Sequence, residues 1–410
     1  MKKLLALLLC LCMLCPAFIA CDNGSGNTDG NSEVTTTTPA AEDVASELVL
    51  VENGKTDYVI VRPDKALSHV IDSMTKLRTA VQEKYNVNLA PQDDFVKGLG
   101  KDESYNSEAL EILIGATNRK ESRDTLATLK PGEYTVRVVG NKLVIIGYTD
   151  YLTSIAVESF INSVVSSADA AKLSIANDYY VLKSQSDFFT LMTGLTMYAM
   201  GDSYFAGSGI GKAETWVNKL GEKYAMHYVN YGIGGSTISN YVTDKNPMCI
   251  RFKDMEKGDA DIILLEGGRN DRTQLVPIGT NDSTDTKTFK GALNTMINDM
   301  MVTYPNALII LVTPWYQTAK VSTGLSNVSY ADAMRELVQH RNDPRLICLY
   351  AADKDATGVN MNDSAFKAQY CIKPDDSSHL NVAGMNMVLP YMEQFIATEY
   401  AKFKGVTLDN

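Results

Sequence analysis

The chain has 410 residues and carries 38 Lys and Arg against 49 Asp and Glu, which gives a formal net charge of −11 at neutral pH. Such an acidic chain lacks the basic surface that neutralises phosphates, which argues against a nucleic-acid-binding protein. The length exceeds that of one average domain and predicts two. Only four His are present, so a multi-histidine metal centre is hard to build, and we expect no metal.

The first 20 residues predict a secretory signal peptide. Lys2 and Lys3 precede an apolar run over 4–14, which is too short and too early for a transmembrane helix. The Ile-Ala-Cys sequence that ends at Cys21 resembles a bacterial lipobox, and this resemblance implies cleavage before Cys21 and a lipid anchor on its thiol. We therefore expect the protein at the extracellular face of a bacterial membrane, held there through Cys21 only. The alternative is an ordinary signal peptide with incidental Cys.

Residues 21–44 predict a disordered tether, because this Gly-, Ser-, Asn- and Thr-rich segment has too little apolar content to form a core. Four of the seven Cys precede or begin this tether. The other three, Cys249, Cys348 and Cys371, cannot all pair with one another, so at most one disulfide can form and its partners stay open. We expect these three mostly as small buried hydrophobic residues.

Residues 45–185 predict a smaller α+β domain. Asn53-Gly54 and Gly140-Asn141 are turn signals between short β-branched or apolar runs and predict two hairpins. Apolar residues at helical spacing predict helices over 66–85 and 153–165. The predicted strands cover 48–51, 58–61, 111–115, 134–139 and 142–146.

Three short sequences in this region point to a known kind of accessory domain: EILIGATNR at 111–119, PGEY at 131–134 and IIG at 145–147. Over roughly residues 45–170 they resemble the non-catalytic N-terminal domain found ahead of bacterial family 67 α-glucuronidases. The resemblance implies a carbohydrate-associated accessory role and says little about chemistry. A generic α+β spacer is the alternative.

Residues 186–410 predict an α/β domain in which near-continuous apolar strands alternate with amphipathic helices. This alternation is typical of a parallel sheet covered on both faces, where sites lie just past the carboxyl ends of the strands. The predicted strands are 195–200, 228–230, 261–265, 307–312 and 346–349, and the predicted helices are 211–225, 289–303, 330–341 and 382–403.

Polar segments follow three of these strands, and a fourth lies near the C-terminus. Ser203 is the candidate nucleophile, and its weakly nucleophilic hydroxyl needs an adjacent base. His379 is the candidate base, because it alone of the four His lies in a loop with a carboxylate three residues before it. Asp376 would orient its imidazole, although Asp375 is adjacent and remains an alternative. The four segments are GDSYFAG at 201–207, NYGIGGST at 230–237, GRND at 268–271 and DSSHLNVAG at 376–384.

A tetrahedral oxyanion needs donors that are already in place. The backbone N–H groups of Ser203 and Gly232 and the side-chain amide of Asn270 would supply three. Gly232 would let the backbone approach closely, where a Cβ would intrude.

In this order the four segments resemble the blocks of the SGNH (GDSL) hydrolase family over about residues 192–403. The namesake residues of the family match Ser203, Gly232, Asn270 and His379, and its Asp-x-x-His block begins at Asp376. The resemblance implies a three-layer α/β/α flavodoxin-like fold and ester hydrolysis through an acyl-enzyme. One departure is Tyr204, which stands where Leu or Ile is common.

Other chemistries find little support in the sequence. The glycines at 207–211 lack the G-x-G-x-x-G spacing, so we expect no nucleotide cofactor, and no H-E-x-x-H sequence suggests a zinc protease. Ser203 does not lie in G-x-S-x-G, which argues against a standard α/β-hydrolase. Arg269 is expected either to contact substrate or to lie on a solvated rim, and Trp315 either to line the pocket or to join the core.

The sequence as a whole predicts a lipid-anchored surface serine esterase that removes acetyl or other small acyl groups from a carbohydrate. Its partner would be an esterified small molecule or a polysaccharide; the sequence leaves the oligomeric state open. A lipase or lysophospholipase of the same fold is the first alternative, and a non-catalytic glycan-binding lipoprotein is the second. Activity should require a neutral His379 imidazole.

Overall fold

The computed structural model describes residues 47–95 and 106–408. The predicted signal peptide, the lipid-anchor residue Cys21 and the predicted tether lie outside these residues. Within the described ranges no helix is long and apolar enough to cross a membrane.

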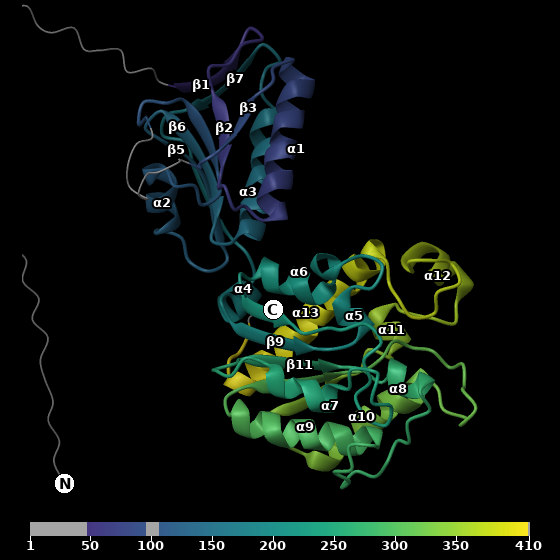
Figure 1. Ribbon diagram of the computed structural model, residues 1–410. Coiled ribbons are helices and arrows are strands. Elements are labelled where there is room, and N and C mark those ends of the chain that lie inside the picture. The colour runs from purple at the N-terminus through teal and green to yellow at the C-terminus, as the bar shows by residue number, and fades with distance from the viewer. Residues whose placement is uncertain (1–46, 96–105, 409–410) are drawn as a thin grey trace, which may run out of the picture. The chain divides into compact units, whose positions relative to one another are not determined.

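The first part of the described chain is built on a six-stranded mixed sheet of order β3-β2-β4-β6-β5-β8. The helices α1 (Ser68–Tyr85) and α3 (Asp150–Phe160) lie along one face of this sheet, and α2 (Lys120–Leu126) lies on the other side (Figure 1). The strands are β2 (Val59–Arg62), β3 (Ala90–Asp93), β4 (Glu111–Ile114), β5 (Glu133–Val139), β6 (Lys142–Gly147) and β8 (Tyr180–Ser184), and a separate antiparallel pair joins β1 (Glu47–Glu52) to β7 (Lys172–Ala176).

One of the two hairpins predicted here is wrong. Asn53 and Gly54 do form a tight turn with φ angles of 49° and 71°, but β1 pairs with β7, and β2 pairs in parallel with β3 and β4. Ile60 and Val61 of β2 are fully buried, so this strand belongs in the middle of a sheet rather than beside a turn. The second predicted hairpin is confirmed, because β5 and β6 pair antiparallel around Gly140.

The second part of the described chain is built on a five-stranded parallel sheet of order β10-β9-β11-β12-β13. Along the chain its strands therefore follow the 2-1-3-4-5 order of flavodoxin-like folds, in which the order reverses between the first and third strands. The strands are β9 (Thr196–Met200), β10 (His227–Asn230), β11 (Ile262–Glu266), β12 (Leu308–Val312) and β13 (Leu346–Leu349).

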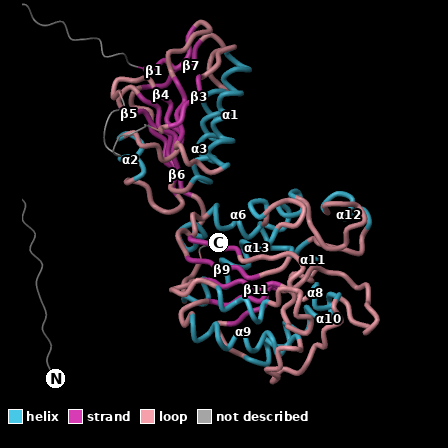
Figure 2. Tube along the Cα trace, viewed as in Figure 1, coloured by secondary structure: helices cyan, strands magenta, loops and turns pink. Residues whose placement is uncertain are grey.

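Two helical layers enclose this sheet, as Figure 2 shows. On one face lie α6 (Trp216–Lys223) and α13 (Val382–Lys404), and on the other lie α7 (Met248–Arg251), α9 (Phe289–Thr303) and α10 (Asn327–Arg341) (Figure 1). The remaining helices are α4 (Asp187–Met192), α5 (Ser203–Ala206), α8 (Arg269–Thr273), α11 (Lys354–Thr357) and α12 (Ser364–Tyr370).

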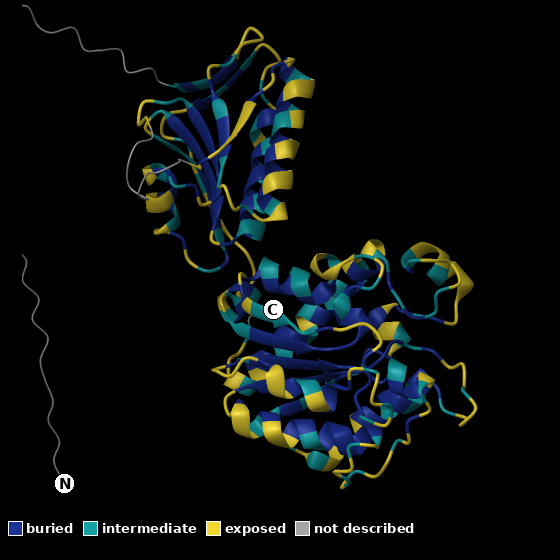
Figure 3. Ribbon diagram, viewed as in Figure 1, coloured by how far each residue is buried: buried dark blue, intermediate teal, exposed yellow. Residues whose placement is uncertain are grey.

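The strand β11 shows how the two layers share the sheet. Ile262 and Leu264 pack in the cluster that includes α6 and α13, whereas Ile263 and Leu265 pack in the cluster of α9 and α10. All four side chains are fully buried, and the central strands carry the buried colour in Figure 3. A strand buried on both faces reads as a continuous apolar run, which is why the sequence predicts this sheet well. The predicted three-layer α/β/α fold is confirmed.

The three Cys in the described residues are free thiols. Cys249 and Cys371 are buried and Cys348 is partly buried. Burial raises the pKa of Cys249 and Cys371 to about 11 and that of Cys348 to about 12, so all three are protonated at neutral pH. They behave as the small hydrophobic residues that the sequence predicts.

Candidate active site

The segment after β9 forms a tight turn that carries Ser203. Asp202 caps the short helix α5, and its Oδ1 accepts the backbone N–H of Tyr204 at 3.0 Å. A Cβ on Gly201 would lie 2.6 Å from the ring of Phe205, so only glycine fits there. Since α5 begins at Ser203, this turn places the side chain of Ser203 at the carboxyl edge of the sheet, beside the loop that follows β11.

Ser203, His379 and Asp376 form one continuous chain of hydrogen bonds. The Oγ of Ser203 lies 2.9 Å from Nε2 of His379, and Nδ1 of His379 lies 3.0 Å from Oδ2 of Asp376. Ser203 is 7% exposed, and the side chain of His379 is 27% exposed. The structure thus brings together residues that lie 176 positions apart, in the geometry that a nucleophile and its base require.

The loop around Asp376 orients this carboxylate. Its Oδ1 accepts the backbone N–H groups of Ser378 at 2.7 Å and His379 at 3.0 Å. Burial alone would raise the pKa of Asp376, but these two bonds and the bond from the imidazole hold it below its ordinary value. The ionised carboxylate that faces His379 therefore belongs to Asp376 and not to its neighbour Asp375.

Aromatic packing supports the same loop from the protein interior. The ring of Tyr204 stacks on Trp315 at 5.6 Å between centroids and meets the His379 ring edge-on at 6.2 Å. Tyr204 and Trp315 are 2% and 1% exposed. Of the two roles considered for Trp315, the structure therefore shows the core role.

Arg269 is partly exposed, and its guanidinium bonds to two side chains of the protein. Its Nε donates to the hydroxyl of Ser378 at 2.9 Å, and its Nη1 contacts Thr273 within α8. The side chain thus links the loop after β11 to the loop of Asp376 and His379.

The three predicted oxyanion donors differ in what they already bind. Both N–H groups of the Asn270 amide have protein acceptors, Oδ2 of Asp202 and the carbonyl of Ser236, each at 2.9 Å. The Gly232 N–H donates to Oδ1 of Asn230 at 2.8 Å. The Ser203 N–H has no acceptor within 47–95 and 106–408. At rest, only one of the three donors is therefore uncommitted.

Gly232 is nevertheless required at its position. A Cβ there would lie 2.5 Å from the backbone N of Ala206 and 2.6 Å from the backbone C of Phe205. The side chain of Asn230 ties the same two segments together, since its Nδ2 donates to the Phe205 carbonyl at 2.8 Å. The close backbone approach expected from the sequence is therefore observed.

Sequence reasoning missed a group of buried ionisable residues beneath this site. Glu266 ends β11 with 1% exposure, and Asp202 is fully buried beside it. Burial raises the pKa of both carboxyl groups. Arg251 of α7 donates to the carbonyls of Gly201 at 2.7 Å and Tyr231 at 2.6 Å. An acidic residue at the end of a four-residue apolar run was the signal that could have revealed Glu266.

Asp271 anchors the loop that follows β10. Its carboxylate accepts the backbone N–H groups of Ile238 at 2.9 Å and Ser239 at 3.0 Å. It is fully buried, and burial raises its pKa to about 6 in spite of these bonds. Asp271 therefore fixes the segment that follows Ser236, which is itself a partner of Asn270.

The remaining His lie outside this arrangement. His340 pairs with Asp282 at 2.8 Å, and His227 lies 3.5 Å from Glu256. Among the described residues, no group of three or more His, Cys, Asp or Glu side chains is arranged to hold a metal ion.

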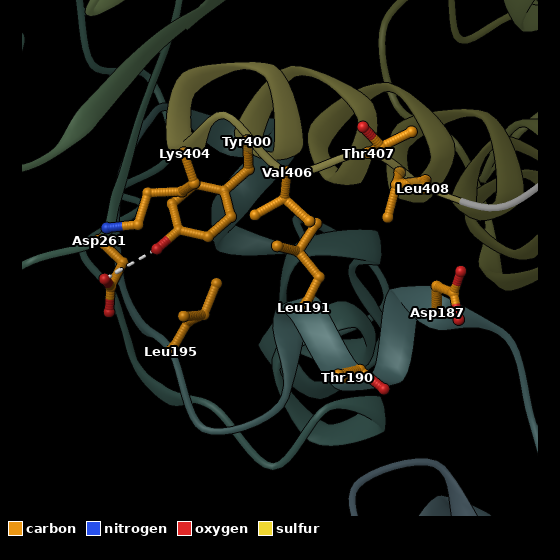
Figure 4. A pocket seen from close by; sticks show the side chains of 10 residues that line it. All are labelled: Asp187, Thr190, Leu191, Leu195, Asp261, Tyr400, Lys404, Val406, Thr407 and Leu408. Carbon is orange, nitrogen blue, oxygen red and sulfur yellow. Dashed lines mark hydrogen bonds between the residues drawn. The ribbon is translucent and has the colours of Figure 1, made fainter. Parts of the chain in front are cut away.

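A cavity of about 530 Å³ lies away from these residues (Figure 4). It is lined by Leu195 and Asp261, which precede β9 and β11, and by residues near the end of the chain. Tyr400 donates a hydrogen bond to Asp261 at 2.9 Å at one side of it. The cavity therefore adjoins the amino ends of the strands, at the edge opposite to Ser203.

Residues 199–386 match the GDSL-like Lipase/Acylhydrolase family, and this range contains all five of the predicted catalytic and oxyanion residues. None of the curated proteins compared with this sequence matches it.

Solved structures resemble about half of the chain. A protein from Lactobacillus plantarum is 24% identical, with a TM-score of 0.43, over 50% of this chain and 98% of its own. The psychrotrophic esterase EstA from Pseudoalteromonas sp. is 17% identical, with a TM-score of 0.35, over 50% and 97%. A carbohydrate esterase family 2 enzyme with a carbohydrate-binding domain, from Corynascus thermopiles (Myceliophthora fergusii), is 13% identical, with a TM-score of 0.34, over 57% and 71%.

Proposed function

We propose that the protein hydrolyses carboxylic esters through an acyl-enzyme on Ser203, and the match of residues 199–386 to the GDSL-like Lipase/Acylhydrolase family supports this. The observation that carries the proposal is the unbroken chain from Ser203 through His379 to Asp376, with heavy-atom distances of 2.9 and 3.0 Å. A hydroxyl, a base and an orienting carboxylate in this order are what acyl transfer needs.

The proton path follows from these contacts. Nε2 of His379 takes the Ser203 proton while Oγ attacks the ester carbonyl carbon, and the carbonyl oxygen becomes an oxyanion. The same nitrogen then gives the proton to the leaving alcohol as the C–O bond breaks. Water repeats the sequence on the acyl-enzyme and releases the acid. Asp376 keeps the Nδ1–H tautomer and stabilises the imidazolium that forms.

The oxyanion would first meet the Ser203 N–H, which is uncommitted. The Gly232 N–H and the Asn270 amide would have to share or exchange their present bonds with Asn230, Asp202 or Ser236. A charge-assisted bond to an anion is roughly twice as strong as a neutral one, so the oxyanion competes well with the neutral oxygens of Asn230 and Ser236. A donor of this kind contributes about 3 kcal/mol to the transition state.

For the substrate, we propose small acyl esters, acetyl above all, on a carbohydrate. The support is the resemblance of residues 45–170 to a carbohydrate-associated accessory domain, together with the predicted anchor at Cys21, which would expose the enzyme to external glycans. The test is acid release from a panel of acetylated glycans, with short- and long-chain aryl esters beside them.

Each outcome of this panel selects one function. Acetate release from glycans and short-chain esters is expected. Preference for long-chain esters would indicate a lipase or lysophospholipase. Glycan binding without any turnover would indicate a non-catalytic glycan-binding lipoprotein.

The surface location has its own test. The wild type should partition with membranes, and Cys21→Ala should move to the soluble fraction. A Cys21→Ala protein that stays membrane-bound would refute the anchor, whereas Cys249→Ala should leave the distribution unchanged.

A further inference from the structure

Two carboxyl groups lie in contact beneath the nucleophile turn. Asp202 precedes Ser203, and Glu266 ends the neighbouring strand β11. Their side chains are 0% and 1% exposed, and Oε2 of Glu266 accepts the backbone N–H of Asp202 at 3.0 Å. Two like charges in contact at a buried position are costly, so such a pair holds one negative charge and one proton.

The hydrogen bonds decide which residue of the pair keeps the charge. Asp202 receives the Tyr204 N–H at 3.0 Å and the Asn270 amide at 2.9 Å, and its Oδ1 lies 3.4 Å from the Ser203 hydroxyl. Glu266 receives a single N–H, and its Oε1 is buried without a hydrogen-bond partner in the described chain. Donors stabilise the ionised form of a carboxyl group, so the charge belongs on Asp202 and the proton on Glu266.

The charged groups around the pair do not change this assignment. Arg251 of α7 directs its guanidinium to carbonyls and to the Ser236 hydroxyl. Arg269 of α8 contacts Ser378 and Thr273, and the neighbouring Asp271 of α8 is another buried acid, which disfavours a second charge on Glu266. His379 faces Ser203 and Asp376.

We propose that Glu266 is a neutral carboxylic acid and a positioning residue for the oxyanion side of the site, a role that rests on the proposed esterase function. Its Oε2 holds the backbone at Asp202, one residue before the nucleophile. Its neutrality leaves Asp202 ionised, and an ionised Asp202 can bind only the NH₂ end of the Asn270 amide. A protonated Asp202 could instead donate to the amide oxygen, and the amide could then turn its donors away.

The first test reads the protonation state without using activity. Infrared difference spectra at neutral pH between wild type and Glu266→Gln should contain a carboxylic-acid C=O band from the wild type. The matched control Glu158→Gln, at a half-exposed position, should remove only carboxylate bands. Loss of carboxylate bands in the Glu266→Gln difference would overturn the proposal.

The second test separates positioning from folding. Glu266→Gln keeps a neutral acceptor for the Asp202 N–H and should keep kcat within about threefold, whereas Glu266→Leu removes the acceptor. Glu266→Leu should lower kcat about ten- to hundredfold at a similar KM, somewhat less than the loss of an oxyanion donor itself. Equal kcat values for the two variants would contradict the positioning role.

If Glu266→Leu does not fold, the infrared difference between wild type and Glu266→Gln still tests whether Glu266 is neutral. If the wild type lacks esterase activity altogether, the proposed function fails, but the infrared spectra still report the protonation state of Glu266.

Discussion

The two sides of the site around Ser203 are prepared to different degrees. On the proton-transfer side, Ser203, His379 and Asp376 already make the bonds that the proposed reaction would use. On the oxyanion side, Gly232 and Asn270 are bound to protein acceptors. Buried N–H groups rarely stay unpaired, which accounts for the acceptors of Gly232 and Asn270, whereas the Ser203 N–H has no acceptor in the described residues. The difference teaches that the proposed proton relay is assembled in advance, whereas two of the three proposed oxyanion donors must first leave their protein acceptors.

The largest expected effect is on the proton-transfer side. Ser203→Ala should abolish acyl-enzyme chemistry and lower kcat by at least about 10³-fold, since removal of a triad nucleophile leaves only binding and oxyanion stabilisation. Hydrolysis of an aryl acetate measures this. Ser208→Ala, directly after the 201–207 segment, serves as the control with near wild-type rates. A Ser203→Ala enzyme with full activity would show that Ser203 is not the nucleophile.

Asp376→Asn should follow, with a loss of about 10²- to 10⁴-fold in kcat, because an amide no longer fixes the Nδ1–H tautomer of His379. Asp375→Asn is the matched control and should retain kcat. If Asp375→Asn lowered kcat and Asp376→Asn did not, the orienting carboxylate would belong to Asp375 and not to Asp376.

Asn270→Ala probes the oxyanion side and should cost about 10²-fold in kcat with little change in KM, because the amide acts on the transition state. The same change frees Oδ2 of Asp202 and the Ser236 carbonyl. If Asn270→Ala leaves kcat unchanged, the amide stays with its resting partners during turnover and the Ser203 N–H acts without it.

The buried acid Asp271 predicts a pH effect on stability. Its pKa rises from 3.8 to about 6 in the folded protein, so between these values the folded state holds more protons than the unfolded state. The stability it contributes is present below pH 4 and is lost as the pH rises to 6, about 3 kcal/mol in all. Denaturant unfolding of wild type against Asp271→Asn should show the difference shrinking over this range. The exposed control Asp254→Asn should show no such trend.

Glu266 should show the same sign. If it is neutral when folded, Glu266→Gln gains stability relative to wild type as the pH rises from 5 to 8, at up to about 1.4 kcal/mol per pH unit. A pH-independent difference would mean that Glu266 is ionised in the folded protein.

The smallest effect belongs to Tyr204. Its hydroxyl is buried without a partner in the described chain, so Tyr204→Phe removes an unpaired polar atom and keeps the stacking on Trp315. We expect unchanged kcat and a gain of at most about 1 kcal/mol in unfolding free energy. A marked loss of kcat would give the hydroxyl a function.

The sequence predicts that Ser203, His379 and Asp376 lie close together, because each of them follows a recognisable strand end or lies in a spaced pair such as Asp376 and His379. It predicts the strand β11 because both faces of this strand are buried, so its sequence is a continuous apolar run. It cannot show that the Asn270 amide is already bonded, because both acceptors come from segments distant in the chain. Nor can it show that Glu266 meets Asp202, a contact that exists only once β9 and β11 pair. The wrong hairpin partner of β1 has the same origin, because a turn signal specifies local geometry but not the strand that completes the sheet.

The most direct test of the account is the mass of the Ser203 peptide after incubation with a fluorophosphonate. The wild type should carry one phosphonyl adduct on Ser203, Asp376→Asn should react much more slowly, and Ser203→Ala should carry none. An unlabelled wild type, or an adduct on another residue, would contradict the claim that Ser203, His379 and Asp376 form a working nucleophilic site.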